Sequence, residues 1–294
     1  MGEVSVVIPS HNEGENLVDT VDCVLANSST SALEVLVVDD GSTDGSGERV
    51  SMRFATDRRV RVVRTSELGV AGARNLGARQ STGHLLVFLD GHCYTPPGWL
   101  PTLTEPLADP AVGMIGPAFT SLEHGNGARG LGVTWRGPSL EIEWLPQQQE
   151  APYPVPLLPG GCQAMRRADF EALGRYDGGM TRWGSEDVEL SLRVWLMGYQ
   201  VLVQPAVLIY HLFRQRHPYP VDGGKVLYNR LRMALLHLSE ERVARVIDSM
   251  KDWPEFAQSL IWLLGSDVVE RRRYYQAHRP RDDEWFCRRF SCPI

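Results

Sequence analysis

Two side chains that can bind a metal ion, Asp90 and His92, come directly after an apolar run at 84–89. Side chains two positions apart in an extended chain point to the same side, so an oxygen and a nitrogen would face one ligand. This mixed pair suits Mn²⁺ or a similar ion better than Ca²⁺. Such an ion neutralises a pyrophosphate leaving group. The alternative is structural, with Asp90 as a helix cap and His92 as an incidental neighbour.

A second polar group, Asp39-Asp40-Gly41-Ser42, follows the apolar run that begins at Leu33. A carboxylate at this position can accept a hydrogen bond from the N3–H of a uracil ring. Gly41 and Ser42 would then make the turn into the next helix. The alternative is a solvated turn and helix cap, because Asp and Ser are favoured in both.

Two adjacent carboxylates, Glu186 and Asp187, begin a helix after a glycine-containing loop. They could cap that helix, bind sugar hydroxyls or act as a general base on an acceptor. The Pro159-Gly160-Gly161 segment offers unhindered backbone to a flat ligand, or it is a plain turn. His211 ends another apolar run and precedes Arg214. A lone histidine there is more often a packed residue than a ligand.

The elements that position these residues follow an α/β pattern. Apolar runs without alternation, each ending in a polar turn, predict parallel strands buried on both faces. Helical spacing lies between them, which predicts a doubly wound start in which ligands bind beyond the carboxyl ends of the strands. The predicted strands lie within 4–13, 33–44, 60–64 and 84–93, and the predicted helices within 15–27, 45–56 and 71–80.

The remaining two-thirds of the chain gives a looser pattern. After 94 it contains many Pro and Gly residues and a polar stretch at 146–156. Helices are predicted at 99–107, 167–173 and 186–197, a strand at 112–119, and two strand-like runs on either side of Pro205. From 223 onward an apolar face at helical spacing predicts helix, broken at Asp252 and followed by a further helix at 256–275.

These boundaries suggest a catalytic domain over 1–222 and a helical extension over 223–294. The extension could shape an acceptor groove or form a homodimer through its apolar faces, or it could pack on the core. With 294 residues, 43% of them hydrophobic, the chain can bury a large core. The net charge of −6 argues against nucleic acid and anionic membranes as partners.

The apolar runs are far shorter than the ~20 residues of a membrane-spanning helix. The N-terminus has neither a basic segment nor a small-residue cleavage site, which predicts a cytoplasmic protein. An odd number of cysteines without a CxxC pair predicts reduced thiols. The exception would be Cys287 and Cys292, which could form a late disulfide or a metal clip.

Taken in order, these motifs resemble the nucleotide-sugar glycosyltransferases of the GT-A fold, and more narrowly the catalytic domain of the polypeptide N-acetylgalactosaminyltransferases. The resemblance runs from about Val4 to Glu241. The Asp90-x-His92 motif and the spacing from His211 through Arg214 to Tyr219 are its most specific parts. It also rests on the segments SHNE, VVDDGS, GARNLGA, GGCQAMRRADFEALGRYDGGM, WGSEDVELSLRVWLMG, HLFRQRHPY and NRLRMA.

The resemblance implies an α/β GT-A fold, a Rossmann-like and mostly parallel mixed sheet with helices on both faces, followed by the helical extension. It also implies roles for the matching residues. Asp90, His92 and His211 would bind the metal. The uridine site would contain His11, Glu13 and Asp40, with Arg74 near the nucleotide. Gly160, Gly161, Trp183 and Glu186 would surround the transferred sugar, while Arg214 and Tyr219 would lie in a loop that closes over the diphosphate.

The implied function is transfer of a hexose or N-acetylhexosamine from a UDP-sugar to a hydroxyl, with Mn²⁺ or another divalent cation. The acceptor would be Ser or Thr of a peptide or protein, or a glycan. The pattern favours retention of the anomeric configuration, with Glu186, Asp187 and Arg214 as catalytic candidates.

Two departures keep alternatives open. Asp187 stands where the family has Asn, and a Glu-Asp pair after Trp-Gly is similar to the inverting β-1,4-galactosyltransferases, in which the Asp deprotonates the acceptor. The family's membrane anchor and lectin domain have no counterpart here. An inverting transferase with Asp187 as base, and a non-catalytic nucleotide-sugar binding protein, are the alternatives.

Overall fold

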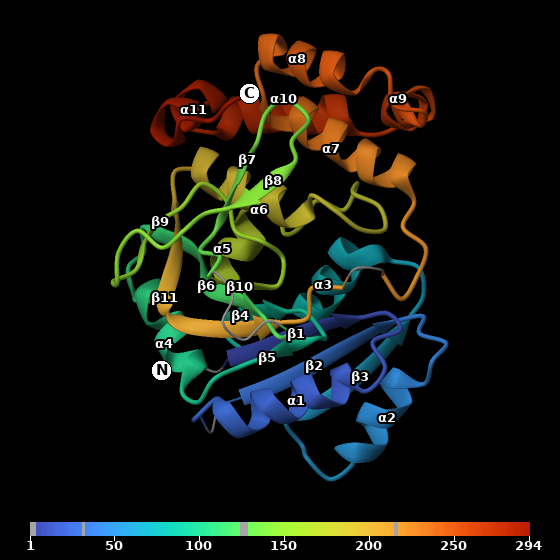
Figure 1. The fold of residues 1–294 in the computed structure, drawn as a ribbon, viewed down its shortest axis with the longest axis vertical. Helices are drawn as coiled ribbons and strands as arrows, with labels where there is room; N and C mark the ends of the chain where they lie inside the picture. Colours follow the sequence, from blue (N-terminus) through green and yellow to red (C-terminus); the bar gives the residue numbers. More distant parts are fainter. Residues whose placement is uncertain (1–3, 31–32, 124–128, 215–216) are drawn as a thin grey trace.

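The computed structural model describes residues 4–30, 33–123, 129–214 and 217–294. A mixed sheet crosses the molecule, with helices packed against it and a group of helices from the C-terminal part at one end (Figure 1). The strand order is β3-β2-β1-β4-β10-β6-β11-β5, with β9 paired to β11. The predicted α/β architecture is therefore confirmed.

The N-terminal half forms the parallel part of the sheet. β1, β2 and β4 are buried on both faces, which explains why their apolar runs lack alternation. β1 lies between β2 and β4, and all three are parallel, as is the β2–β3 pair. The elements are β1 (Val4–Ser10), α1 (Asn16–Asn27), β2 (Leu33–Asp40), α2 (Ser46–Arg53), β3 (Val60–Thr65), α3 (Gly69–Gln80) and β4 (Leu85–Leu89).

The second half of the sheet is mixed. β10 (Cys162–Arg166), which the sequence pattern did not predict, inserts antiparallel between β4 and β6. β6 (Val112–Ser121) and β11 (Gln200–His211) are parallel, which brings the end of β11 to the edge where β1, β2 and β4 also end. The shorter strands are β5 (Cys93–Tyr94), β7 (Val133–Trp135), β8 (Ile142–Trp144) and β9 (Tyr153–Pro154).

The prediction of two strands around Pro205 is wrong, because β11 is continuous. Proline has no N–H to donate to a neighbouring strand, and such residues occur at bulges. The pairing of β11 with β6 shifts register between Gln204 and Leu208, which accommodates Pro205 inside one strand. His211 is thereby the last residue of β11.

Helices between the strands lie close to their predicted positions. The 99–107 segment splits into α4 (Trp99–Thr104) and a 3₁₀ turn, η1 (Glu105–Ala108), before Pro110. The others are α5 (Arg167–Ala172) and α6 (Glu186–Leu196). α6 follows a loop in which Gly184 and Ser185 both have positive φ, so Glu186 and Asp187 stand in its first turn.

The C-terminal segment is helical, as predicted, but it contains more helices than the pattern indicated. The predicted helix at 256–275 is interrupted at Gly265, a poor helix former, and forms two helices. The C-terminal helices are α7 (Gly223–His237), α8 (Glu240–Met250), α9 (Phe256–Leu264), α10 (Val268–His278) and α11 (Asp283–Phe290).

Buried polar contacts connect these helices to α6. Glu189 of α6 forms an ion pair with Arg193 at 2.6 Å and contacts His237 of α7 at 2.7 Å, and all three side chains are buried. Apolar residues of α7, α8 and α10 also belong to the hydrophobic cluster that contains α6 and one face of the sheet. The helical segment is therefore continuous with the core that supports α6.

Within the described residues, no helix has the length and apolar character that a membrane span requires. All five cysteines are free thiols. Cys287 and Cys292 therefore do not form a disulfide.

Candidate functional site

A cleft of about 1190 Å³ opens where β1, β2, β4 and β11 end. Parallel strands bring their carboxyl ends to one edge, and for that reason residues far apart in sequence meet there. All fourteen predicted site residues line this cleft: His11, Glu13, Asp40, Arg74, Asp90, His92, Gly160, Gly161, Trp183, Glu186, Asp187, His211, Arg214 and Tyr219. The structure thus brings the set together, while their roles remain predictions.

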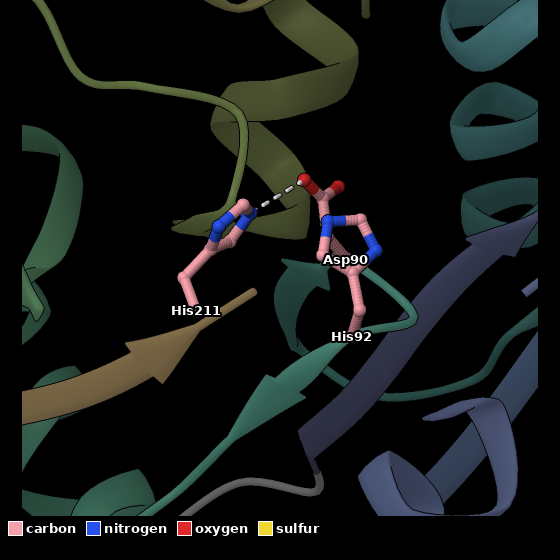
Figure 2. A group of neighbouring side chains, drawn as sticks. All are labelled: Asp90, His92 and His211. Carbon is pink, nitrogen blue, oxygen red and sulfur yellow. Dashed lines mark ion pairs between the residues drawn. The ribbon is translucent and has the colours of Figure 1, made fainter. Parts of the chain in front are cut away.

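Asp90, His92 and His211 all line the cleft, and their side chains point toward one another (Figure 2). One ligand atom from each residue lies within 4.8 Å of the others. Asp90 Oδ2 is 3.6 Å from His211 Nε2, and the two imidazole rings are 4.6 Å apart between centroids. The β11–β5 pairing sets this geometry, because it places His211 opposite Cys93, the neighbour of His92.

The three side chains fit a divalent transition-metal ion. One carboxylate and two imidazoles are a ligand set typical of Mn²⁺ or Zn²⁺ rather than Ca²⁺. The Nδ1 atom of His211 is buried and has no hydrogen-bond partner among the described residues. Burial lowers the pKa of His211 more than Asp90 raises it, which favours the neutral imidazole that a metal requires.

The carboxyl group of Asp90 is held in its ionised form. Burial raises its pKa, but the contact with His211 and the charge of Arg74 outweigh that effect. The pKa of Asp90 therefore lies below the ordinary range of an aspartate. An ionised oxygen at this position is the state that binds a cation.

Glu13 lies beside the metal-ligand cluster. Its Oε2 atom is 3.1 Å from His92 Nδ1 and 2.5 Å from Arg214 Nη2. A carboxylate that accepts from one imidazole nitrogen leaves the other nitrogen free for a metal. In this structure Glu13 therefore orients His92 and binds Arg214. The resemblance had implied only a place in the uridine site.

Arg74 is almost fully buried at the base of the cleft. Its Nη1 donates to Glu186 Oε1 at 2.9 Å. Nη2 donates to Asp90 Oδ1 at 3.0 Å and to the carbonyl oxygen of Gly160 at 2.8 Å. One planar guanidinium therefore connects the predicted metal site with the predicted sugar site, a geometry that suits Arg rather than Lys.

Glu186 and Asp187 are adjacent carboxylates in a poorly solvated place. Burial and the neighbouring Asp187 raise the pKa of Glu186 to about 7. Burial likewise raises the pKa of Asp187. Glu186 Oε2 accepts from the Gly184 amide at 3.0 Å, so one of its oxygens faces the loop and the other faces Arg74.

Two of the predicted uridine residues, His11 and Asp40, lie next to each other in the lining of the cleft. His11 Nδ1 is 2.7 Å from the carbonyl oxygen of Asp40, and the His11 ring packs edge-on against Tyr219 at 5.1 Å. Both carboxylate oxygens of Asp40 accept from backbone amides, of Leu68 at 2.9 Å and Gly69 at 2.8 Å. Asp40 thus holds the backbone at the start of α3 in this structure, and its role in uracil binding stays a prediction.

Aromatic contacts join the two walls of the cleft. Trp183 packs against His217 with centroids 4.9 Å apart, and His217 packs against Tyr219 at 5.5 Å. Because Tyr219 also contacts His11, these four rings form a continuous line from Trp183 to His11. His217 and Tyr219 therefore connect Trp183 with His11 in the lining of the cleft.

Several cleft residues were absent from the predicted set. Trp144 of the β7–β8 hairpin and Phe213 lie edge-on at 5.8 Å, and each is about 40% exposed. Phe213 in turn packs on His211 at 4.4 Å. The only signal in the sequence was the position of Phe213 inside the HLFRQRHPY segment. No sequence pattern pointed to Trp144 or Ile142. They reach the cleft because they lie in a short hairpin that is distant in sequence from the other site residues.

Two protein-family models and several curated relatives match this chain. The family model described as glycosyl transferase family 2 matches residues 5–174, and the one described as N-terminal domain of galactosyltransferase matches residues 146–218. Polypeptide N-acetylgalactosaminyltransferase 11 of Xenopus tropicalis is 33% identical over 256 residues, 80% of this chain and 43% of that protein. A putative polypeptide N-acetylgalactosaminyltransferase 13 of Drosophila melanogaster is 33% identical, covering 98% of this chain and 56% of that protein.

Among solved structures, GalNAc-T7 with UDP, GalNAc and Mn²⁺ superposes with a TM-score of 0.83. The identity is 23%, and the match covers 99% of this chain and 57% of that one. A likeness at this identity shows the fold, which confirms the predicted GT-A architecture. The chain spans about half the length of the curated relatives it matches.

Proposed function

Because the chain belongs to glycosyl transferase family 2, we propose that it transfers a hexose or N-acetylhexosamine from a UDP-sugar to an acceptor hydroxyl. The observation that carries the proposal is the convergence of Asp90, His92 and His211 on the floor of the cleft. A sugar-nucleotide reaction needs its diphosphate leaving group neutralised. A chain with no net positive charge must do this locally.

The metal would be Mn²⁺ or another divalent cation, held by Asp90, His92 and His211. When bound, it would supply positive charge to the diphosphate as the glycosidic bond breaks. Arg214, released from Glu13, would add charge to the same leaving group. The Mn²⁺ in the GalNAc-T7 structure and the polarity of these side chains support the assignment.

The choice of a UDP-sugar rests on two supports. The relatives are named N-acetylgalactosaminyltransferases, and UDP and GalNAc stand in the description of the similar structure. In this chain His11 and Tyr219 offer ring faces where a base could stack, beside the backbone of Asp40. We assign uracil recognition to this corner of the cleft and the sugar to the side of Glu186.

The acceptor would be a Ser or Thr hydroxyl of a peptide or protein. Exposed apolar side chains, Ile142, Trp144 and Phe213, stand at the mouth of the cleft next to the predicted metal site. Such a rim favours an extended chain with apolar side chains over a free sugar, whose hydroxyls require more hydrogen-bonding partners. The names of the relatives point to the same class of acceptor.

We favour a retaining transfer. An inverting enzyme needs a base opposite the leaving group, and Asp187 is the residue placed for that role in the alternative. The match of residues 146–218 to a galactosyltransferase domain favours this alternative. Against it, both oxygens of Asp187 already accept hydrogen bonds from backbone amides, which competes with accepting a proton from an acceptor hydroxyl.

The proposal is tested with a panel of UDP-sugars, Mn²⁺ and a Ser/Thr-containing peptide with apolar flanking residues. We expect one donor to give a peptide whose mass increases by one sugar residue. Retention predicts that the anomeric configuration in the product, measured by NMR coupling constants, equals that of the donor. Donor turnover without peptide modification would point to a glycan acceptor, and an inverted product would assign the base role to Asp187.

A further inference from the structure

We propose that Asp187 is a positioning residue that fixes the predicted metal ligand Asp90 through the Gly160–Gly161 turn, rather than a base that deprotonates the acceptor. The inference rests on the proposed function, because it concerns the same metal-dependent site. It assigns a role to Asp187, which stands where the family has Asn.

The first link is between Asp187 and the turn. Asp187 Oδ2 accepts from the backbone N–H of Gly160 at 2.6 Å, and Oδ1 accepts from the N–H of Val188 at 2.8 Å. Each carboxylate oxygen therefore has a backbone donor. One donor lies in the first turn of α6, and the other lies in a loop 27 positions earlier in the chain.

The second link connects the turn to Asp90 through two sets of hydrogen bonds. The carbonyl oxygen of Gly161 accepts from the N–H of Asp90 at 3.0 Å. The carbonyl oxygen of Gly160 accepts from Arg74 Nη2, which also donates to Asp90 Oδ1 at 3.0 Å. Both the backbone and the side chain of Asp90 are thus set by the position of these two glycines.

The turn has little room to move. A Cβ on Gly160 would lie 3.0 Å from Arg74 Nη2 and 3.2 Å from Asp187 Oδ2. A Cβ on Gly161 would lie 2.9 Å from the ring of Phe119 and 3.3 Å from Cδ2 of His211. The turn therefore fits tightly between Asp187 on one side and a predicted metal ligand on the other. A displacement on the Asp187 side would be passed to Asp90 and His211.

The two roles make opposite predictions for asparagine at this position. An amide oxygen can still accept from Gly160, at the cost of the bond to Val188, so Asp187→Asn preserves the link to the turn. An amide has no basicity, so the same variant would remove a catalytic base. Asp187→Ala removes both functions. Asp248→Asn, which makes the same change on the exposed surface of α8, is the matched control.

The experiment measures Mn²⁺ affinity by the EPR signal of free Mn²⁺, which needs no donor, and UDP release with the best donor. We expect Asp187→Ala to weaken Mn²⁺ binding about 10- to 100-fold, as changes to residues that orient metal ligands do. Asp187→Asn should stay within about tenfold of the wild type in both measurements, since it loses a single hydrogen bond. Asp248→Asn should not differ from the wild type.

The proposal is overturned if Asp187→Ala binds Mn²⁺ as the wild type does. It is also overturned if Asp187→Asn binds Mn²⁺ normally but loses about 100-fold or more in UDP release, the loss expected for a general base. If the alanine variant does not fold, the asparagine variant alone decides. A wild-type protein that binds Mn²⁺ but turns over no donor contradicts the proposed function, and the Mn²⁺ measurements still test the positioning role.

Discussion

Arg74 and Glu186 form a buried ion pair with a distance of 2.9 Å between Nη1 and Oε1, although 112 positions separate them in the chain. Arg74 belongs to α3 and Glu186 begins α6. The same guanidinium holds Asp90 through its other terminal nitrogen. The predicted metal site and the predicted sugar site therefore share a single buried cation.

Arg74→Lys should weaken both sites. A lysine ammonium is a single charge on a flexible stem and cannot hold two carboxylates in one plane. We expect the free energy of unfolding to fall by about 3–5 kcal/mol, because one buried carboxylate loses its partner. Mn²⁺ affinity should fall with it. Urea unfolding and Mn²⁺ titration measure the two effects, with Arg79→Lys, on the exposed face of α3, as the control. Equal stability of the two variants would contradict this account of Arg74.

Glu186 should make stability depend on pH. Its pKa is about 7 in the folded protein against an ordinary value of 4.5, so the folded state keeps the proton that the unfolded chain releases. Stability contributed by this group is therefore lost as pH rises from about 4.5 to 7. We expect metal-free wild type to lose up to about 3 kcal/mol relative to Glu186→Gln across this window. A difference between the two proteins that does not vary with pH would contradict the raised pKa.

Glu13→Gln should impair metal binding without unfolding the protein. The carboxylate lies 3.1 Å from His92 Nδ1, and removing its charge weakens the contact that orients this ring. We expect Mn²⁺ affinity to fall about 10- to 100-fold. Glu15→Gln, two residues along the chain and exposed, is the control. Unchanged affinity in Glu13→Gln would show that His92 does not depend on Glu13.

Removal of residues 223–294 tests the domain boundary. Glu189 and Arg193 of α6 are buried against His237, and leaving them without this cover would expose a polar network and the apolar surface around it. We expect the fragment 1–222 to be insoluble or to lack a cooperative thermal transition by circular dichroism. A fragment that unfolds cooperatively would establish 1–222 as an independent domain.

The sequence predicts those residues of the site that stand at the ends of strands. Asp40, Asp90 and His211 each end or follow an apolar run, and parallel strands deliver such residues to one edge. The resemblance added the metal-binding role of His211 and the place of Arg214. The cytoplasmic location and the homodimer stay predictions.

The rest depends on contacts that no local pattern encodes. β10 lies antiparallel between β4 and β6. Its five residues carry no sequence pattern that predicts this position, which only the strand pairing in the structure reveals. In the sequence, Arg74 is an ordinary residue of a predicted helix. The groups that accept its hydrogen bonds, on Glu186, Asp90 and Gly160, come from other segments of the chain. Asp40 is a further example, because its carboxylate accepts from the backbone amides of Leu68 and Gly69 at the start of α3, and this contact is not visible in the sequence around Asp40.

The most direct test of the account is UDP release from the preferred UDP-sugar by the wild type and by Asp90→Asn, each with EDTA and after Mn²⁺ is restored. We expect EDTA to abolish release by the wild type and Mn²⁺ to restore it. Asp90→Asn should stay inactive at Mn²⁺ concentrations that saturate the wild type, while its circular dichroism spectrum remains that of a folded protein. Full activity in EDTA, or an Asp90→Asn variant as active as the wild type, would contradict the assignment of Asp90, His92 and His211 as the metal site.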